Sequence, residues 1–212
     1  MRPLTLDHVA LWVAGRDAIA EVLTTRTEMH VIERTDRFTL LGADARRGKL
    51  TLFDAEGPRE PGPLARIGLR VASLPDGPTE FDAGEGLRIA LVEAATDVDY
   101  DLDHVALTTG DPDAARAGWE QLGFAPLEDG RLEVGGAYLL LEPGETAFSE
   151  QPLLNHIGVL VESVDEHVAD AEDLGVEVDG VVDAPNTIAL FVWGPERVKL
   201  EYVEHKPTFS QS

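Results

Sequence analysis

A six-residue segment occurs twice in this chain, and the duplication constrains the fold more than any other feature. Leu-Asp-His-Val-Ala-Leu stands at residues 6–11 and again at residues 102–107. Its apolar and β-branched content predicts a strand. A helical stretch follows each copy, at residues 16–25 in the first half and between the cap Asp111 and Gly123 in the second. Three short strands are expected after each helix, so the repeating unit is a strand, a helix and three strands.

Two further units complete the chain. Residues 64–71 match residues 154–161 at Leu, Ile, Gly and Val. The later copy continues with a helix near residues 164–174 and three strands. In the earlier copy residues 73–86 are rich in Pro, Gly and Asp, which predicts a truncated unit without a helix.

We expect the four units to pair into two halves of the chain, each made of two units that are adjacent in the sequence. We expect an N-terminal pair at residues 1–97, a C-terminal pair at residues 98–205, and a disordered tail at residues 206–212.

The charge balance excludes some partners. The chain has 40 acidic residues against 17 lysines and arginines, for a net charge of −23. This charge repels phosphate backbones, so no nucleic-acid partner is expected, and it suits a protein of a salt-loving cell. There is no cysteine. No apolar stretch approaches the roughly 20 residues of a membrane span, and no secretory leader is visible, so we expect a cytoplasmic protein without a membrane partner.

Two features are typical of a known family. They are the histidines of the opening strands, at positions 8, 104 and 156, and the segment Lys-Leu-Glu-Tyr-Val-Glu at residues 199–204. The chain resembles the vicinal oxygen chelate superfamily, which includes glyoxalase I, bleomycin-resistance proteins and extradiol dioxygenases. The resemblance implies an α+β fold of four βαβββ modules, paired into two cupped mixed-sheet domains. Four modules in one chain resemble the two-domain extradiol dioxygenases most.

That resemblance also implies a metal site. The positions that match the ligands of those dioxygenases are His104, His156 and Glu201. The corresponding N-terminal positions are His8, Arg66 and Ala90, which implies that the N-terminal half is metal-free. Two histidines and a carboxylate leave coordination positions open, an arrangement typical of Fe(II); Mn(II), Co(II), Ni(II) and Zn(II) are also compatible with it.

Three functions stay open. The leading expectation is ring cleavage of a small catechol-like substrate that binds through two vicinal oxygens. A second is an isomerase, lyase or epimerase of the glyoxalase type, which resembles a pattern with a fourth ligand. Leu140 stands at that ligand position, and a β-bulge would bring in Glu142, two residues on, as the extra ligand. A third is a non-catalytic binding or resistance protein with a small molecule in an N-terminal cup. Any of them could be a monomer or a homodimer.

The acid-base groups of the dioxygenase pattern are missing or replaced in this sequence. Phe191 stands where the dioxygenase pattern has a tyrosine. Tyr138 and Asn186 are candidates to line the cup instead. His205 is expected to be exposed in the tail region.

Overall fold

The computed structural model describes residues 1–27, 29–45, 48–96, 101–145 and 149–209. In these residues the four predicted modules are present. The first consists of β1 (Thr5–Val13), α1 (Arg16–Arg26), β2 (His30–Arg34), β3 (Phe38–Gly42) and β4 (Lys49–Asp54). The second consists of β5 (Leu64–Val71), β6 (Glu80–Asp82) and β7 (Arg88–Glu93), and residues 64–96 contain no helix. The truncation expected from the sequence is therefore confirmed.

The third and fourth modules are complete. The third consists of β8 (Asp101–Thr109), α2 (Pro112–Gln121), β9 (Ala125–Pro126), β10 (Leu132–Val134) and β11 (Ala137–Pro143). The fourth consists of β12 (Leu154–Leu160), α3 (Val164–Leu174), β13 (Val178–Asp183), β14 (Thr187–Trp193), a short 3₁₀ turn (Pro195–Arg197) and β15 (Lys199–His205).

The boundaries of two helices follow from local chemistry. The Asp111 carboxylate accepts a hydrogen bond from Ala114 N, 3.1 Å away, and so caps α2. The Ser163 hydroxyl caps α3 in the same way by accepting from Glu166 N. Gly175 ends α3 in the left-handed conformation, with φ of 65°, which glycine adopts without steric cost.

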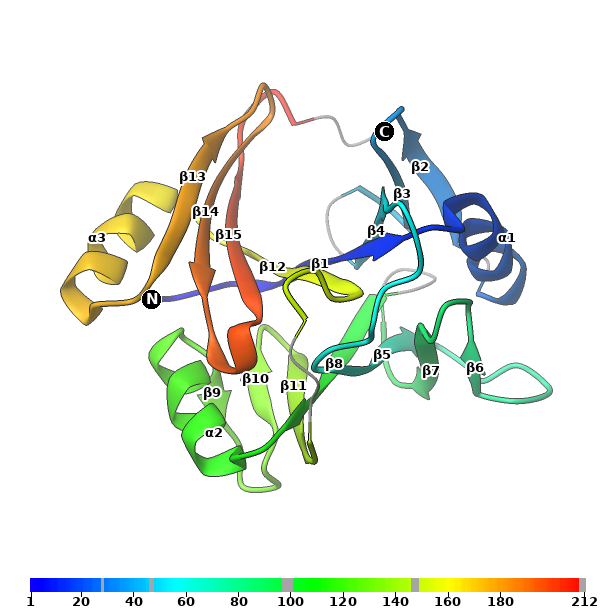
Figure 1. The fold of residues 1–212 in the computed structure, drawn as a ribbon, viewed down its shortest axis with the longest axis horizontal. Helices are drawn as coiled ribbons and strands as arrows, with labels where there is room; N and C mark the ends of the chain where they lie inside the picture. Colours follow the sequence, from blue (N-terminus) through cyan, green and yellow to red (C-terminus); the bar gives the residue numbers. More distant parts are fainter. Residues whose placement is uncertain (28, 46–47, 97–100, 146–148, 210–212) are drawn as a thin grey trace.

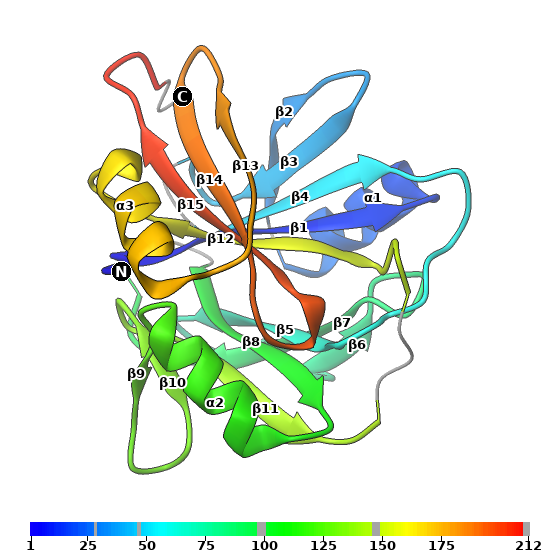
Figure 2. The same cartoon turned by 60° about the vertical axis from the view of Figure 1, so that its left-hand side comes forward.

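The modules pair differently from the expected N-terminal and C-terminal halves. One sheet has the strand order β13-β14-β15-β12-β1-β4-β3-β2, and therefore joins the first module to the fourth. The other has the order β6-β7-β5-β8-β11-β10-β9 and joins the second module to the third. Figures 1 and 2 show the two sheets as separate layers. The division into residues 1–97 and 98–205 is thus wrong.

The physical reason is that either pairing satisfies the same local rule. In each sheet a glycine of one opening strand lies opposite the histidine of the other: Gly158 pairs with His8, and Gly68 with His104. Pairing the modules as sequence neighbours would also place a glycine opposite a histidine. The duplicated sequence therefore does not distinguish the two arrangements.

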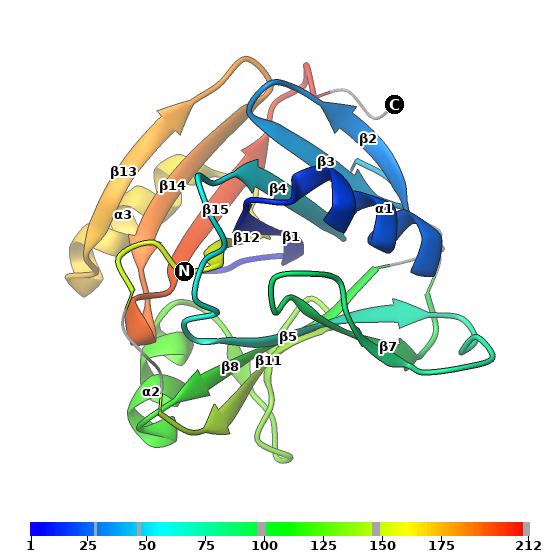
Figure 3. The ribbon, with the colours of Figure 1, turned by 45° about the vertical axis from the view of Figure 1, so that its right-hand side comes forward.

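The larger sheet is strongly curved. Strands β13–β15 form one arm and strands β2–β4 the other, as Figure 1 shows, and Figure 3 shows the same two arms after a 45° turn. Helices α3 and α1 lie outside the two arms (Figure 1). A continuous core that includes Val9, Leu11, Val105 and Leu107 spans both sheets.

The first residues of the tail are folded back rather than disordered. Lys206 N donates to Asn186 O at 2.9 Å, and Phe209 N donates to Lys206 O at 2.8 Å. Residues 210–212 lie outside the described part of the chain. No helix among the described residues combines the length and apolar character that a membrane crossing requires.

Candidate metal centre

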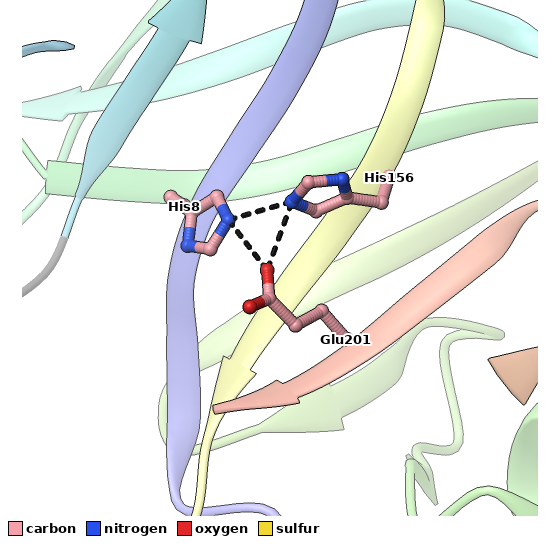
Figure 4. A group of neighbouring side chains, drawn as sticks. All are labelled: His8, His156 and Glu201. Carbon is pink, nitrogen blue, oxygen red and sulfur yellow. Dashed lines mark hydrogen bonds and ion pairs between the residues drawn. The ribbon is translucent and has the colours of Figure 1, made fainter. Parts of the chain in front are cut away.

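Three side chains of the larger sheet converge on one point (Figure 4). Nε2 of His8, on β1, lies 2.9 Å from Nε2 of His156, on β12. Oε2 of Glu201, on β15, lies 3.0 Å from the His8 nitrogen and 2.9 Å from the His156 nitrogen. Among the described residues these three form a group with metal-binding geometry.

The strand register explains why they meet. Gly158 on β12 is the partner of His8 on one side and of Glu201 on the other. Because glycine has no side chain, His8 and Glu201 can approach each other above it. A Cβ at this position would lie 2.3 Å from Cε1 of His8. His156 precedes Gly158 by two residues and so projects from the same face.

Two β-bulges place the residues that orient the histidine rings. The register of β1 against β12 shifts between Leu6 and His8, and shifts again opposite Asn155. An extra residue in a strand changes the direction of local side chains. The displaced residues are Asp7 and Asn155. Asp7 Oδ2 accepts from Nδ1 of His8 at 2.8 Å, and Asn155 Oδ1 accepts from Nδ1 of His156 at 3.0 Å.

These outer contacts make the donor set suitable for a metal. With both Nδ1 atoms donating hydrogen bonds, both Nε2 atoms carry lone pairs when the two imidazoles are neutral. Two lone-pair nitrogens and a carboxylate oxygen within 3.0 Å of one another repel unless a cation lies between them. Ligands about 2.1 Å from a metal at adjacent octahedral corners would be about 3.0 Å apart. The arrangement therefore fits three corners of one face of an octahedron.

The electrostatics agree with a site built for a cation. Burial alone would lower the pKa of His8, but the charges and hydrogen bonds of Glu201 and Asp7 reverse this and raise it to about 9. Burial would raise the pKa of Glu201, yet the neighbouring histidines hold it well below its usual range. Burial lowers the pKa of His156, and the attraction of Glu201, which acts in the opposite direction, only partly offsets this effect. In the metal-free protein, protonated His8 thus supplies the positive charge that a metal ion would otherwise bring to the site.

Asp7 is itself held in place by positive groups. Burial would raise its pKa, but hydrogen bonds from His205 and His8 and the charge of Lys49 keep it well below the usual range. The Lys49 ammonium lies 2.8 Å from Asp7 Oδ2, and both side chains are buried. Asp7 therefore stays ionised and can orient His8.

A cavity of about 290 Å³ opens above the three ligands. Its walls include four phenylalanine rings, at positions 38, 53, 191 and 209. The Phe191 ring meets the His156 ring edge-on, with centroids 5.4 Å apart. Phe209 from the tail stacks on His205 at 3.8 Å and lies 5.3 Å from the Lys49 ammonium. The expectation that His205 is exposed is wrong, because only 17% of its side chain is exposed and it lines this cavity.

His104 does not belong to this group, contrary to the ligand set expected from the sequence. It lies on β8 in the other sheet, where its Nδ1 is 2.8 Å from Asp103. Its buried Nε2 has no hydrogen-bond partner among the described residues. The positions around it that match His156 and Glu201 are Arg66 and Ala90. The N-terminal half is therefore not separate from the site, since His8 supplies the third ligand.

The other candidates from the sequence also lie away from the centre. Glu142 forms an ion pair with Arg66 in the smaller sheet. Tyr138, on β11 of that sheet, has the Arg131 guanidinium stacked over its ring at 4.1 Å. Asn186 lies in the turn between β13 and β14, where its carbonyl accepts from Lys206. None of them reaches the three ligands.

Sequence reasoning missed the roles of five residues around the site: Asp7, His8, Lys49, Asn155 and His205. The Asp-His pair was visible in both copies of the repeat, and it is the signal that could have identified Asp7 as the partner of His8. Thr51 occupies the position in the larger sheet that Leu140 holds in the smaller one, opposite Ala10 and Ala106 respectively. The fourth-ligand position of the glyoxalase pattern therefore carries a threonine in this site.

Neither a protein-family model nor a curated protein matches the chain by sequence. Solved structures do match in fold. A candidate dioxygenase from Bacillus subtilis superposes with a TM-score of 0.76 at 14% identity, over 97% of this chain and 86% of that one. Glyoxalase I from Zea mays gives 0.71 at 15% identity, over 94% and 92%. The cppA protein from Streptococcus pneumoniae gives 0.65 at 14% identity, over 96% and 100%.

These likenesses extend over nearly the whole chain. The chain therefore has the fold of these solved structures, with four modules arranged in two mixed sheets.

Proposed function

We propose that this protein is a mononuclear metal-dependent enzyme that acts on a small aromatic substrate with two vicinal oxygens. The observation that carries the proposal is the group of His8, His156 and Glu201 at the floor of an aromatic cavity. Three protein ligands on one octahedral face would leave three positions open, enough for a bidentate substrate and one further molecule.

Fe(II) is the metal we propose. Two histidines and one carboxylate on one face are typical of non-haem Fe(II) oxygenases. When bound, the metal would stabilise negative charge on two chelating substrate oxygens, and Fe(II) would add redox chemistry with O2. In the proposed reaction both atoms of O2 enter the product as the ring opens beside its hydroxyl groups.

The protein's own side chains would prepare the substrate. The phenylalanine walls favour a flat ring, and a cavity of about 290 Å³ is at the small end of ligand pockets. Phe191 cannot exchange a proton, so the tyrosine role of the dioxygenase pattern needs another group. We propose His205, which lies in the cavity wall four residues after Glu201. Its imidazole would accept a proton from a substrate hydroxyl.

The site can form within a single chain. All three ligands, Asp7 and His205 come from the first and fourth modules of one molecule. We therefore propose that a monomer is sufficient for activity.

Oxygen uptake tests the proposal. Protein purified without air and loaded with one Fe(II) per chain should consume one O2 per molecule of substrate across a panel of substituted catechols. Glu201→Gln should abolish uptake, whereas Glu142→Gln, which removes a carboxylate from the other sheet, should leave it unchanged.

Two other outcomes would overturn parts of the proposal. Failure to bind any divalent metal would remove the enzyme proposal altogether. Tight metal binding without oxygen uptake, together with isomerisation of an α-hydroxycarbonyl substrate in the presence of Zn(II), Co(II) or Ni(II), would instead assign a glyoxalase-type reaction.

A further inference from the structure

A second and larger cavity, of about 460 Å³, lies on the same concave sheet beside the metal centre. Two indole rings, those of Trp12 and Trp193, form part of its lining. Three cationic side chains, those of Arg59, Arg197 and Lys199, also line it. The chain has 17 lysines and arginines against 40 acidic residues. Three cations and one carboxylate, Glu150, in the lining reverse the charge balance of the whole chain.

The strand register fixes the position of this cavity relative to the metal ligands. Phe191 lies opposite Glu201, and Trp193 lies opposite Lys199, on the same pair of strands. Two residues along a strand cover about 7 Å and return to the same face. The Trp193–Lys199 pair is thus the next step along the sheet from the metal site. Asn155, which bonds His156, also contributes to the lining.

The cations are available to a ligand. Arg197 and Lys199 lie over the Trp193 ring, at 4.2 and 4.6 Å from its centroid. Each also pairs at 2.7 Å with an exposed carboxylate, Glu177 and Asp179 respectively. Ion pairs this exposed contribute little, so an anionic ligand can replace them at small cost. Nε of Arg59 is buried and has no hydrogen-bond partner among the described residues.

We propose that this cavity binds an anionic group, a carboxylate or a phosphate, carried on an arm of the molecule whose ring occupies the metal cavity. The identity of that ring rests on the proposed function. The anionic subsite itself does not require the metal. Arginine and lysine would bind the charged oxygens, and the indole rings would pack against the arm.

Binding of simple probes to metal-free protein tests the subsite. The probes are 3-phenylpropionate, phenyl phosphate and the neutral 3-phenylpropanamide, titrated at low salt with indole fluorescence as the readout. At least one anionic probe should bind about tenfold or more tightly than the amide. The anion that binds more tightly identifies the charged group.

Variants make the test specific. Lys199→Gln and Arg197→Gln should each weaken binding of the anionic probe by about tenfold or more. Arg131→Gln is the matched control, because Arg131 also stacks on an aromatic ring and pairs with an exposed aspartate, but in the smaller sheet. It should leave the affinity unchanged.

Three results would overturn the subsite: equal affinity for the anions and the amide, unchanged affinity in Lys199→Gln and Arg197→Gln, or an equal loss in Arg131→Gln. Metal content, measured separately, should remain at the wild-type level in all three variants. A protein that binds the anions but no metal would retain the subsite and lose the proposed function.

Discussion

Gly158→Ala should abolish metal binding although it replaces none of the three ligand residues. The new Cβ would lie 2.3 Å from Cε1 of His8, whereas an ordinary carbon–carbon contact is about 3.5 Å. The imidazole would therefore have to move by about 1.2 Å. Because a metal–nitrogen bond is about 2.1 Å long, this displacement breaks it.

The expected loss of metal affinity can be bounded. Changes to residues that merely support a ligand typically cost 10-fold to 100-fold. Displacement of the ligand itself should exceed this range, so we expect a loss of at least about 100-fold, or ~2.7 kcal/mol. The measurement is a competition titration with a chelator of known affinity, carried out without air.

Gly68→Ala is the matched control. Its Cβ would lie 2.3 Å from Cε1 of His104, the same clash in the other sheet. Both variants should lose about 1–3 kcal/mol of stability in urea unfolding of the metal-free protein. Only Gly158→Ala should lose metal. Wild-type metal affinity in Gly158→Ala, or an equal loss in Gly68→Ala, would refute the assignment of His8 as a ligand.

Three further predictions concern the surroundings of the ligands. Asn155→Ala should weaken metal binding by about 10-fold to 100-fold in the same competition titration, because Nδ1 of His156 loses its acceptor; an unchanged affinity would contradict this role. Metal affinity should rise with pH towards about 9, where His8 loses its proton. In the metal-free protein that proton adds stability that is complete below the unfolded pKa of about 6.5 and is lost as the pH rises through 9. Urea unfolding with and without metal should therefore diverge above pH 7, and parallel curves would contradict the assignment. Phe209→Ala should enlarge the metal cavity and speed the entry of a catechol, measured by stopped-flow absorbance; an unchanged rate would show that the tail does not restrict access.

Repetition in the sequence was sufficient to predict the modules. The two copies of Leu-Asp-His-Val-Ala-Leu, the caps Asp111 and Gly175 and the missing helix after residue 71 are local features, and the structure confirms them. Local features arise from interactions between near neighbours in the chain, so a single sequence contains them.

Module pairing depends instead on contacts between distant strands. Both possible pairings place a glycine opposite a histidine, and both bring His156 and Glu201 to one site. They differ only in whether His8 or His104 completes it. The sequence therefore located two of the three residues in the observed group, and the third was assigned to the wrong copy of the repeat.

The supporting residues were hidden for a related reason. Asp7 and Asn155 reach the histidine rings because each sits at a β-bulge, and a bulge is a property of paired strands rather than of one segment. His205 was expected in the tail region rather than in a strand. β15 extends through His205, which brings its side chain to the face that carries Glu201.

Metal content of two alanine variants tests the central claim most directly. Wild-type protein, His8→Ala and His104→Ala would be loaded with Fe(II) without air, freed of excess metal and analysed for iron per chain. We predict one iron in the wild type and in His104→Ala, and no stoichiometric iron in His8→Ala. Iron retained by His8→Ala and lost from His104→Ala would contradict both the metal centre and the pairing of the first module with the fourth.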